Sequence, residues 1–241
     1  MLLAATVAVS PVLTALQEDA AASETEKGSR PALRLAQRAG LVTVGLEVRD
    51  DGYRITLHPP EIEDMPAPAV TEMRVSSSGS RAAIIPVASC GEACSTADQN
   101  VPAGAVVVDV DIDYAKQQYT ARFRFSWPMP PNGQPLLERA ARKTATLDKV
   151  WVHERVTSNP RFGVYANPPK LVAGDDLANT YAVAGAQEAR VLPASKGLRR
   201  IAYYVPTVTL WVEVWVAPDG RIVRDRFVSR TRLWTQTHAL P

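Results

Sequence analysis

The sequence predicts a mainly β protein made of two antiparallel units. Apolar and charged residues alternate along "VVVDVDIDYAKQQYTARFRFSW", which is typical of two half-buried strands joined by a turn. A similar alternation returns near the C-terminus in "LWVEVWVAPDGRIVRDRFV". The charge also divides unevenly, with a net −5 over residues 1–127 and +7 over residues 128–241, which favours two domains.

The first sixteen residues, "MLLAATVAVSPVLTAL", carry no charge. The run is shorter than the roughly 20 apolar residues of a membrane-spanning helix, and it lacks the basic residue that usually opens a signal peptide. We expect residues 1–16 to be a membrane anchor or a signal-like segment; a short helix packed on the protein is the alternative. Residues 17–39 are expected to form an exposed tether, with a helix possible over 30–37.

Residues 40–127 are predicted to form an immunoglobulin-like β-sandwich. A first hairpin is expected from strands 41–48 and 53–58 around "RDDG", followed by a proline-rich loop and a strand over 71–76. In the hairpin of residues 106–127, a turn over 115–118 would place Val110 opposite Phe123 and Asp111 opposite Arg122. The aspartates of this hairpin could bind Ca²⁺, but carboxylates that face arginines favour an ion-pair ladder.

The segment "PMPPNGQP", residues 128–135, is expected to be a linker, and residues 136–241 a helix with a curved antiparallel sheet, a half-barrel. The helix should cover 136–147. Strands are expected at 149–158, 179–185, 188–193 and 199–206, with a long loop over 159–174. A last hairpin turns at Pro218–Asp219–Gly220. Its simplest register pairs Trp211 with Phe227 but sets Glu213 against Asp225, an unfavourable pair.

Aromatic and basic residues of the second domain suggest two surfaces. An apolar ligand such as a lipid could occupy a concavity lined by Trp151, Tyr203, Trp211 and Trp215, although ordinary core packing explains the same residues. Arginines of one strand parity could meet phosphate groups, but a water-facing side is the commoner use of such a row: Arg224, Arg226, Arg230 and Arg232. No nucleic-acid partner is expected, because the row lacks interleaved exposed aromatic residues.

Both cysteines of the chain, Cys90 and Cys94, lie in "SCGEACSTAD", which we expect to be a loop. Outside the cytoplasm they would form a disulfide, worth about 2 kcal/mol for so short a loop. Alternatively, the soft thiolates could bind Cu(I) or act in redox chemistry, with His58, ahead of His153 and His238, as the candidate third ligand, or they could stay unpaired. The disulfide is the interpretation we favour. No phosphate-binding loop, nucleophile elbow or zinc-protease motif is present in the sequence, so we expect a non-enzymatic protein.

The arrangement resembles a known family. The opening "RAARKTATLDKVWVHERVTSNP" and the ending "LWVEVWVAPDGRIVRDRFVSRTRLW" of the second domain are similar to the extracytoplasmic C-terminal region of bacterial, actinobacterial-type copper-resistance D-like membrane proteins. The second half looks like a lipoprotein-carrier half-barrel, and the cysteine spacing resembles the copper site of Sco-type chaperones. The resemblance implies a role in copper uptake or homeostasis at the outer face of a membrane.

We therefore expect an extracytoplasmic module, membrane-anchored or secreted, that works in copper handling beside a membrane or membrane-protein partner. No cofactor is required, and copper is the one candidate. A carrier of an apolar ligand and a structural or assembly scaffold are the alternatives.

Overall fold

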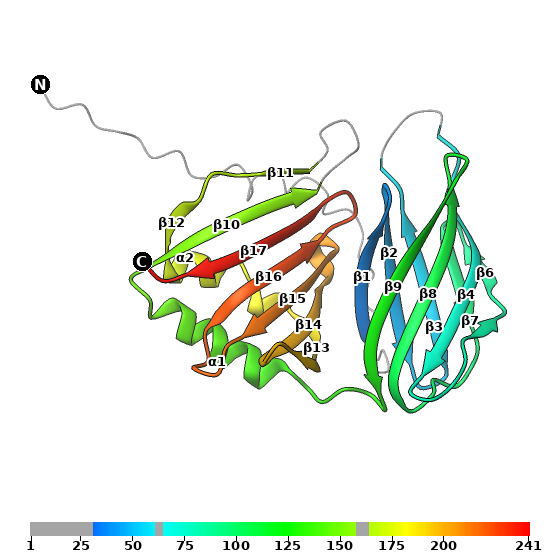
Figure 1. Cartoon of the computed structure of the whole chain (residues 1–241), viewed down its shortest axis with the longest axis horizontal. Coiled ribbons are helices and arrows are strands. Elements are labelled where there is room, and N and C mark those ends of the chain that lie inside the picture. The colour runs from blue at the N-terminus through cyan, green and yellow to red at the C-terminus, as the bar shows by residue number, and fades with distance from the viewer. Residues whose placement is uncertain (1–30, 61–64, 158–163) are drawn as a thin grey trace, which may run out of the picture.

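The computed structural model describes residues 31–60, 65–157 and 164–241 (Figure 1). The expected anchor over residues 1–16 and most of the expected tether lie outside these residues. The described chain is mainly β and its sheets are antiparallel, as the alternation predicts.

The first unit consists of two sheets with a common core. One sheet has the order β1-β2-β3-β7-β6, with β1 (Leu33–Ala39), β2 (Val42–Arg49), β3 (Gly52–His58), β7 (Cys94–Ala97) and β6 (Ala88–Gly91). The other has the order β5-β4-β8-β9, with β5 (Ala83–Ile85), β4 (Ala69–Ser77), β8 (Gly104–Tyr114) and β9 (Gln117–Trp127). Side chains of alternate parity from both sheets, such as Val44, Ile55, Val108 and Phe123, are buried together. This burial on one face explains the period-two pattern of the sequence.

The β8–β9 hairpin keeps the predicted faces but not the predicted register. Val108, not Val110, lies opposite Phe123, and Asp109 lies opposite Arg122. The turn is shorter than expected, because only Ala115 and Lys116 connect the strands and both have positive φ angles. Two consecutive left-handed residues form the tight turn that suits the twist of a hairpin. Since the shift is two residues, every side chain stays on its predicted face.

The second unit is an eight-stranded sheet with two helices. The main path has the order β11-β10-β17-β16-β15-β14-β13, and β12 also pairs with β10. Its strands are β10 (Lys149–Thr157), β11 (Val164–Ala166), β12 (Lys170–Ala173), β13 (Gln187–Ser195), β14 (Leu198–Val205), β15 (Leu210–Val216), β16 (Ile222–Val228) and β17 (Leu233–Ala239). The helices are α1 (Gln134–Ala145) and α2 (Gly174–Asn179). The expected strand over 179–185 is wrong, since that stretch ends α2 and continues into a 3₁₀ turn at Val183–Gly185.

Both helices cover one face of this sheet, which we call the inner face. Leu137 and Ala140 of α1 and Leu177 of α2 are buried against strand residues that include Tyr203 and Val214. The opposite, outer face carries the residues of the other parity, among them Trp211 and Trp215 on β15. Figure 1 shows α1 running across the inner side of the sheet.

The final hairpin avoids the predicted charge conflict by means of a β-bulge. Trp211 pairs with Val228 and Glu213 pairs with Arg226, while Val216 pairs with Ile222, so Val223 is the extra residue. The expected pairing of Glu213 with Asp225 is therefore wrong. The last segment is also two strands rather than one, because Ser229–Arg232 form a turn between β16 and β17.

The two units are joined by an interface that the sequence did not predict. Residues 33–39, expected in the tether and in part as helix, form β1, which packs on the outer face of the second sheet (Figure 1). Ala36, Trp211 and Val228 form an apolar cluster there. Leu192 and Ala202 of the second unit join the core of the first.

Polar contacts surround this apolar interface. The Thr43 hydroxyl donates to the carbonyl of Ser229 (3.0 Å), and an Arg38 guanidinium nitrogen donates to the carbonyl of Thr231 (3.2 Å). Arg34 Nε lies 3.1 Å from Glu188 Oε2. Each of these contacts joins a side chain of the first unit to a residue of the second unit, so together they hold the two units in one relative orientation.

The proline-rich segment between the units is paired rather than free. The N–H of Gly133 donates to the carbonyl of Ala189 (2.7 Å), and the N–H of Val191 donates to the carbonyl of Pro131 (2.9 Å). Asn132 thereby forms a bridge to Arg190 of β13. A Cβ on Gly133 would meet the backbone of Arg190 at 3.1 Å, which explains the glycine at this close approach.

Candidate functional site

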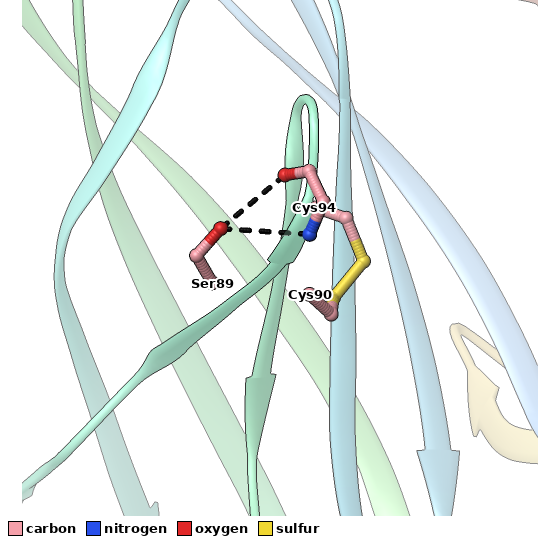
Figure 2. The surroundings of a disulfide bond; sticks show 4 residues. Ser89, Cys90 and Cys94 are labelled. Atoms are coloured by element: carbon pink, nitrogen blue, oxygen red, sulfur yellow. Dashed lines mark hydrogen bonds between the residues drawn. A yellow bond between two sulfur atoms is a disulfide. The ribbon is translucent and has the colours of Figure 1, made fainter.

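Cys90 and Cys94 form a disulfide, as the sequence analysis favoured (Figure 2). The cysteines lie on the short β6–β7 hairpin rather than in the expected loop, with their Cα atoms 5.1 Å apart. Ser89 supports the turn, because its hydroxyl donates to the carbonyl of Gly91 (3.3 Å). All four residues of β6 are exposed, so solvent and reductants reach this hairpin.

His58, the candidate third copper ligand, lies at the interface between the two units. Its imidazole ring is 5.5 Å from the ring of Trp211. Burial, together with the nearby charge of Arg230, lowers the pKa of His58 to about 4. Cys94 lies opposite Thr56, which is on the same face of β3 as His58. Within residues 31–60, 65–157 and 164–241, however, no three His, Cys, Asp or Glu side chains form a group that could hold a metal ion.

The four aromatic residues of the predicted apolar pocket do not line one cavity. Tyr203 points to the inner face, where it is fully buried and donates a hydrogen bond to the carbonyl of Tyr181 (2.7 Å). Trp211 is buried against the first unit, and Trp215 is also on the outer face, below the guanidinium groups of Arg200 and Arg224. Trp151 is 38% exposed at the far edge of the same sheet. α1 and α2 occupy the inner face that the prediction left open.

The acidic row of β8 forms ion pairs, as predicted, but with other partners than Arg122 for Asp111 and Arg124 for Asp109. Asp109 accepts two hydrogen bonds from the Arg122 guanidinium, at 2.7 and 2.8 Å. The hydrogen bond from Arg122 lowers the pKa of Asp109. Asp111 accepts from Arg74 (2.7 Å) and from the hydroxyl of Thr120. These carboxylates already have partners, which accounts for the row without Ca²⁺.

A buried polar cluster on the inner face escaped the sequence analysis. Asp225 is fully buried, and its Oδ2 lies 3.0 Å from Nε2 of His238. His238 Nδ1 lies 3.2 Å from the carbonyl oxygen of Ile222, which can only accept, so this nitrogen carries a proton. Burial raises the pKa of the Asp225 carboxyl. The sequence did hold a signal for this cluster. Asp225 lies between two outward-facing arginines of β16 and has the same strand parity as the buried Phe227, which predicts that its carboxylate faces the core.

The outer face combines arginines with a tryptophan. Arg224 Cζ lies 4.6 Å and Arg200 Cζ lies 5.6 Å from the centre of the Trp215 ring, within the range of cation–π attraction. Arg200 and Arg226 also lie on either side of Glu213, at 3.0 and 3.7 Å. Arg230 and Arg232, expected in the same strand row, belong to the turn after β16 instead.

The chain matches no protein-family model, and a search of characterised proteins finds no significant relative. Among the helices of the described residues, none has the length and apolar character needed to cross a bilayer.

Proposed function

We propose that this chain is a non-enzymatic extracytoplasmic module that works beside a membrane-protein partner in copper handling. The observation that carries the location is the Cys90–Cys94 disulfide on an exposed hairpin. An exposed disulfide between neighbouring residues is readily reached by cellular reductants, and such bonds persist in oxidising compartments. This supports a place outside the cytoplasm.

The architecture proposed for the two units follows the family resemblance. We take the first unit to be an immunoglobulin-like sandwich and the second to be a half-barrel of the lipoprotein-carrier type. The two facing sheets with one core support the first assignment, and the long antiparallel sheet covered by α1 supports the second. Leu137, Ala140 and Leu177 fill the inner face, which makes transport of an apolar ligand there the weaker alternative.

Copper would be captured by the reduced cysteines. A dithiol reductant of the partner or the compartment, itself oxidised to a disulfide, would convert the Cys90–Cys94 disulfide by thiol–disulfide exchange into two thiols on one exposed hairpin, and thiolates are preferred ligands of Cu(I). His58 lies on the same face of the neighbouring strand but is packed against Trp211, so it would join only if the interface opened.

A competition titration tests this proposal. The full chain, with the disulfide reduced, would be titrated with Cu(I) against a chromogenic Cu(I) chelator, beside the variant Cys90→Ser. We expect the native sequence to take one Cu(I) per chain from the chelator and the variant to lose that capacity. His153→Gln, at an exposed position of the second unit, is the matched control and should behave like the native sequence. Equal copper uptake by the native chain and Cys90→Ser would refute the cysteine-based role.

A further inference from the structure

Exposed apolar side chains gather at one corner of the outer face. Trp151 on β10 lies opposite Leu171 of β12 on one side and Ala239 of β17 on the other. Trp151 is 38% exposed and Leu171 is 42% exposed, and Leu240, the next residue after β17, is 50% exposed. We call Trp151, Leu171 and Ala239 the corner patch, and Leu240 directly follows it in the chain. In Figure 1 the corner patch lies where β10, β12 and the C-terminus come together, at the edge of the sheet far from the first unit.

Basic residues border the corner patch on the same face. Lys149 and Arg155 have the same strand parity as Trp151, and all three are exposed. His153 lies between Trp151 and Arg155 on that face. The residues that follow it across the paired strands are Thr237 of β17, Arg224 of β16 and Trp215 of β15. The corner patch is therefore bordered by basic side chains and not by carboxylates.

These cations have little compensating charge. Glu213 is the one carboxylate on the outer face of the paired strands β10 and β14–β17 in the described chain, and it already lies beside Arg200 and Arg226. Among the described residues, no carboxylate forms an ion pair with Lys149, Arg155 or Arg224. Asp175 and Asp176 belong to α2, which covers the inner face. Within the part of the chain that the structure describes, the outer face thus presents positive charge without carboxylate partners next to exposed tryptophan and leucine.

We propose that the corner patch and its basic border dock on the surface of an anionic membrane. Tryptophan is favoured at the boundary between headgroups and acyl chains, where its ring is apolar and its N–H can reach water. Lysine and arginine beside it attract anionic lipid headgroups, each contributing about a fivefold gain in binding near the surface. The inference deepens the proposed function by naming the surface that faces the membrane, but its residues and charges are independent of copper.

A membrane fits these residues better than single-stranded nucleic acid. Strand binding requires aromatic rings that are free to stack on bases. Trp215, in the middle of the basic row, is 8% exposed and has Arg224 and Arg200 against its ring. On the outer face of the described strands the exposed aromatic ring is that of Trp151, and its cross-strand neighbours are leucine and alanine, which suit a lipid boundary; Tyr165, 44% exposed, pairs with Val156 of the other parity.

Vesicle binding by the full chain tests the charge requirement. Flotation would compare vesicles of phosphatidylcholine alone with vesicles of equal parts phosphatidylcholine and phosphatidylglycerol, at low and at physiological ionic strength. We expect stronger binding to the anionic vesicles, weakened by salt. The double variant Arg155→Glu/Arg224→Glu should weaken binding to them by more than about tenfold. The matched control Arg139→Glu/Arg142→Glu makes the same change on exposed positions of α1, on the other side of the sheet, and should stay within about twofold of the native chain.

Tryptophan quenching tests the geometry. Brominated phosphatidylglycerol quenches rings that reach the acyl boundary, and Trp151 is the tryptophan that is most exposed in the described chain. We expect quenching of the native chain on anionic vesicles and its loss in Trp151→Phe, which keeps an apolar ring and most of the binding. This readout is local, so it separates docking of the corner patch from any attachment through residues 1–16.

Three outcomes would overturn the proposal. They are equal binding to neutral and anionic vesicles, equal weakening by the two double variants, or quenching that persists unchanged in Trp151→Phe. Binding to single-stranded DNA without binding to vesicles would show that the basic residues of the outer face bind a soluble polyanion and not a membrane. The Cu(I) titration is made without vesicles, so failure of the copper role and failure of membrane docking are observed separately.

Discussion

At the residue scale, His58 links the chemistry of a single side chain to the association of the two units. Its ring contacts Trp211, a residue of the second unit, and burial keeps it neutral at physiological pH. A proton on this imidazole would place a charge in the interface beside Arg230. Protonation therefore opposes the folded, docked state.

We predict that acid weakens the protein through His58. Because the folded-state pKa lies at about 4, below the ordinary value of 6.5, the full stability is present above pH 6.5 and is lost as the pH falls towards 4. The shift corresponds to about 3 kcal/mol of the free energy of unfolding. Urea unfolding at several pH values in this window would measure it.

The variant His58→Phe keeps a ring against Trp211 but has no titrating group. Between pH 6.5 and pH 4 it should therefore lose about 3 kcal/mol less of its free energy of unfolding than the native chain. His153→Gln, at an exposed position, should retain the native pH dependence. A native profile in His58→Phe would show that other groups cause the acid sensitivity.

At the element scale, one threonine attaches α1 to the sheet. Thr144 is fully buried; its hydroxyl donates to the carbonyl of Ala140 (2.9 Å) and accepts from the N–H of Ile222 (3.1 Å). Gly174 lets the start of α2 approach the same turn, because a Cβ there would lie 2.4 Å from the carbonyl oxygen of Thr144. The end of α1 is thus fixed to both α2 and β16.

Replacing Thr144 with valine should cost about 2 kcal/mol of the free energy of unfolding, since the buried N–H of Ile222 loses its acceptor while the side-chain volume is kept. Thr146→Val, at the exposed end of the same helix, is the matched control and should cost less than about 0.5 kcal/mol. Chemical denaturation followed by circular dichroism measures both. Equal effects would contradict the proposed role of the Thr144 hydroxyl.

The β6–β7 hairpin offers a second test at this scale. It lies at the edge of its sheet, and β7 alone connects it to β3. Removing the disulfide by Cys90→Ser/Cys94→Ser should cost no more than about 2 kcal/mol, the chain-entropy value for so short a loop. Amide hydrogen exchange should rise in residues 88–97 and stay unchanged in β8 and β9. Faster exchange throughout the first unit would show instead that the disulfide supports the whole sandwich.

At the scale of the whole molecule, the packing of β1 on the second sheet decides how the units behave. Gly45 on β2 is part of this contact, because a Cβ there would lie 3.0 Å from the Trp211 ring and 2.5 Å from the Thr56 hydroxyl. The absence of a side chain lets the tryptophan lie directly against the strand. An interface of this kind predicts that the two units unfold together.

Truncation of Trp211 should separate them. We expect Trp211→Ala to cost about 3 kcal/mol and to split a single calorimetric transition into two, as the apolar centre of the interface is removed. Trp151→Ala, on the exposed edge of the same sheet, should leave one transition with little change in its midpoint. A single transition in Trp211→Ala would mean that the paired linker and the polar contacts suffice to couple the units.

Much of the fold could be predicted from local patterns. The alternation in β8, β9 and β10 identified these strands and their buried faces, because a strand with one buried face repeats every two residues. Asp109 and Asp111 were correctly interpreted as ion-pair residues, although their arginine partners differ from the predicted ones, and the disulfide of Cys90 and Cys94 was the favoured interpretation among three. The predicted register of the last hairpin was wrong, and the unfavourable approach of Glu213 and Asp225 in it was the local sign; the β-bulge that removes this pair is seen only in the structure.

The sequence by itself thus determined that the chain is mainly β and which faces of the recognised strands are buried, and it favoured the disulfide, since each depends on neighbours within a few residues or on one hairpin. Only the tertiary structure decided that β1 belongs to the interface, that α1 and α2 fill the inner face, and that Trp151 is exposed while Tyr203 is buried. Those outcomes depend on contacts between segments far apart in the chain. The period-two pattern of apolar residues predicts that one face of a strand is buried, but it does not identify the segment that covers that face.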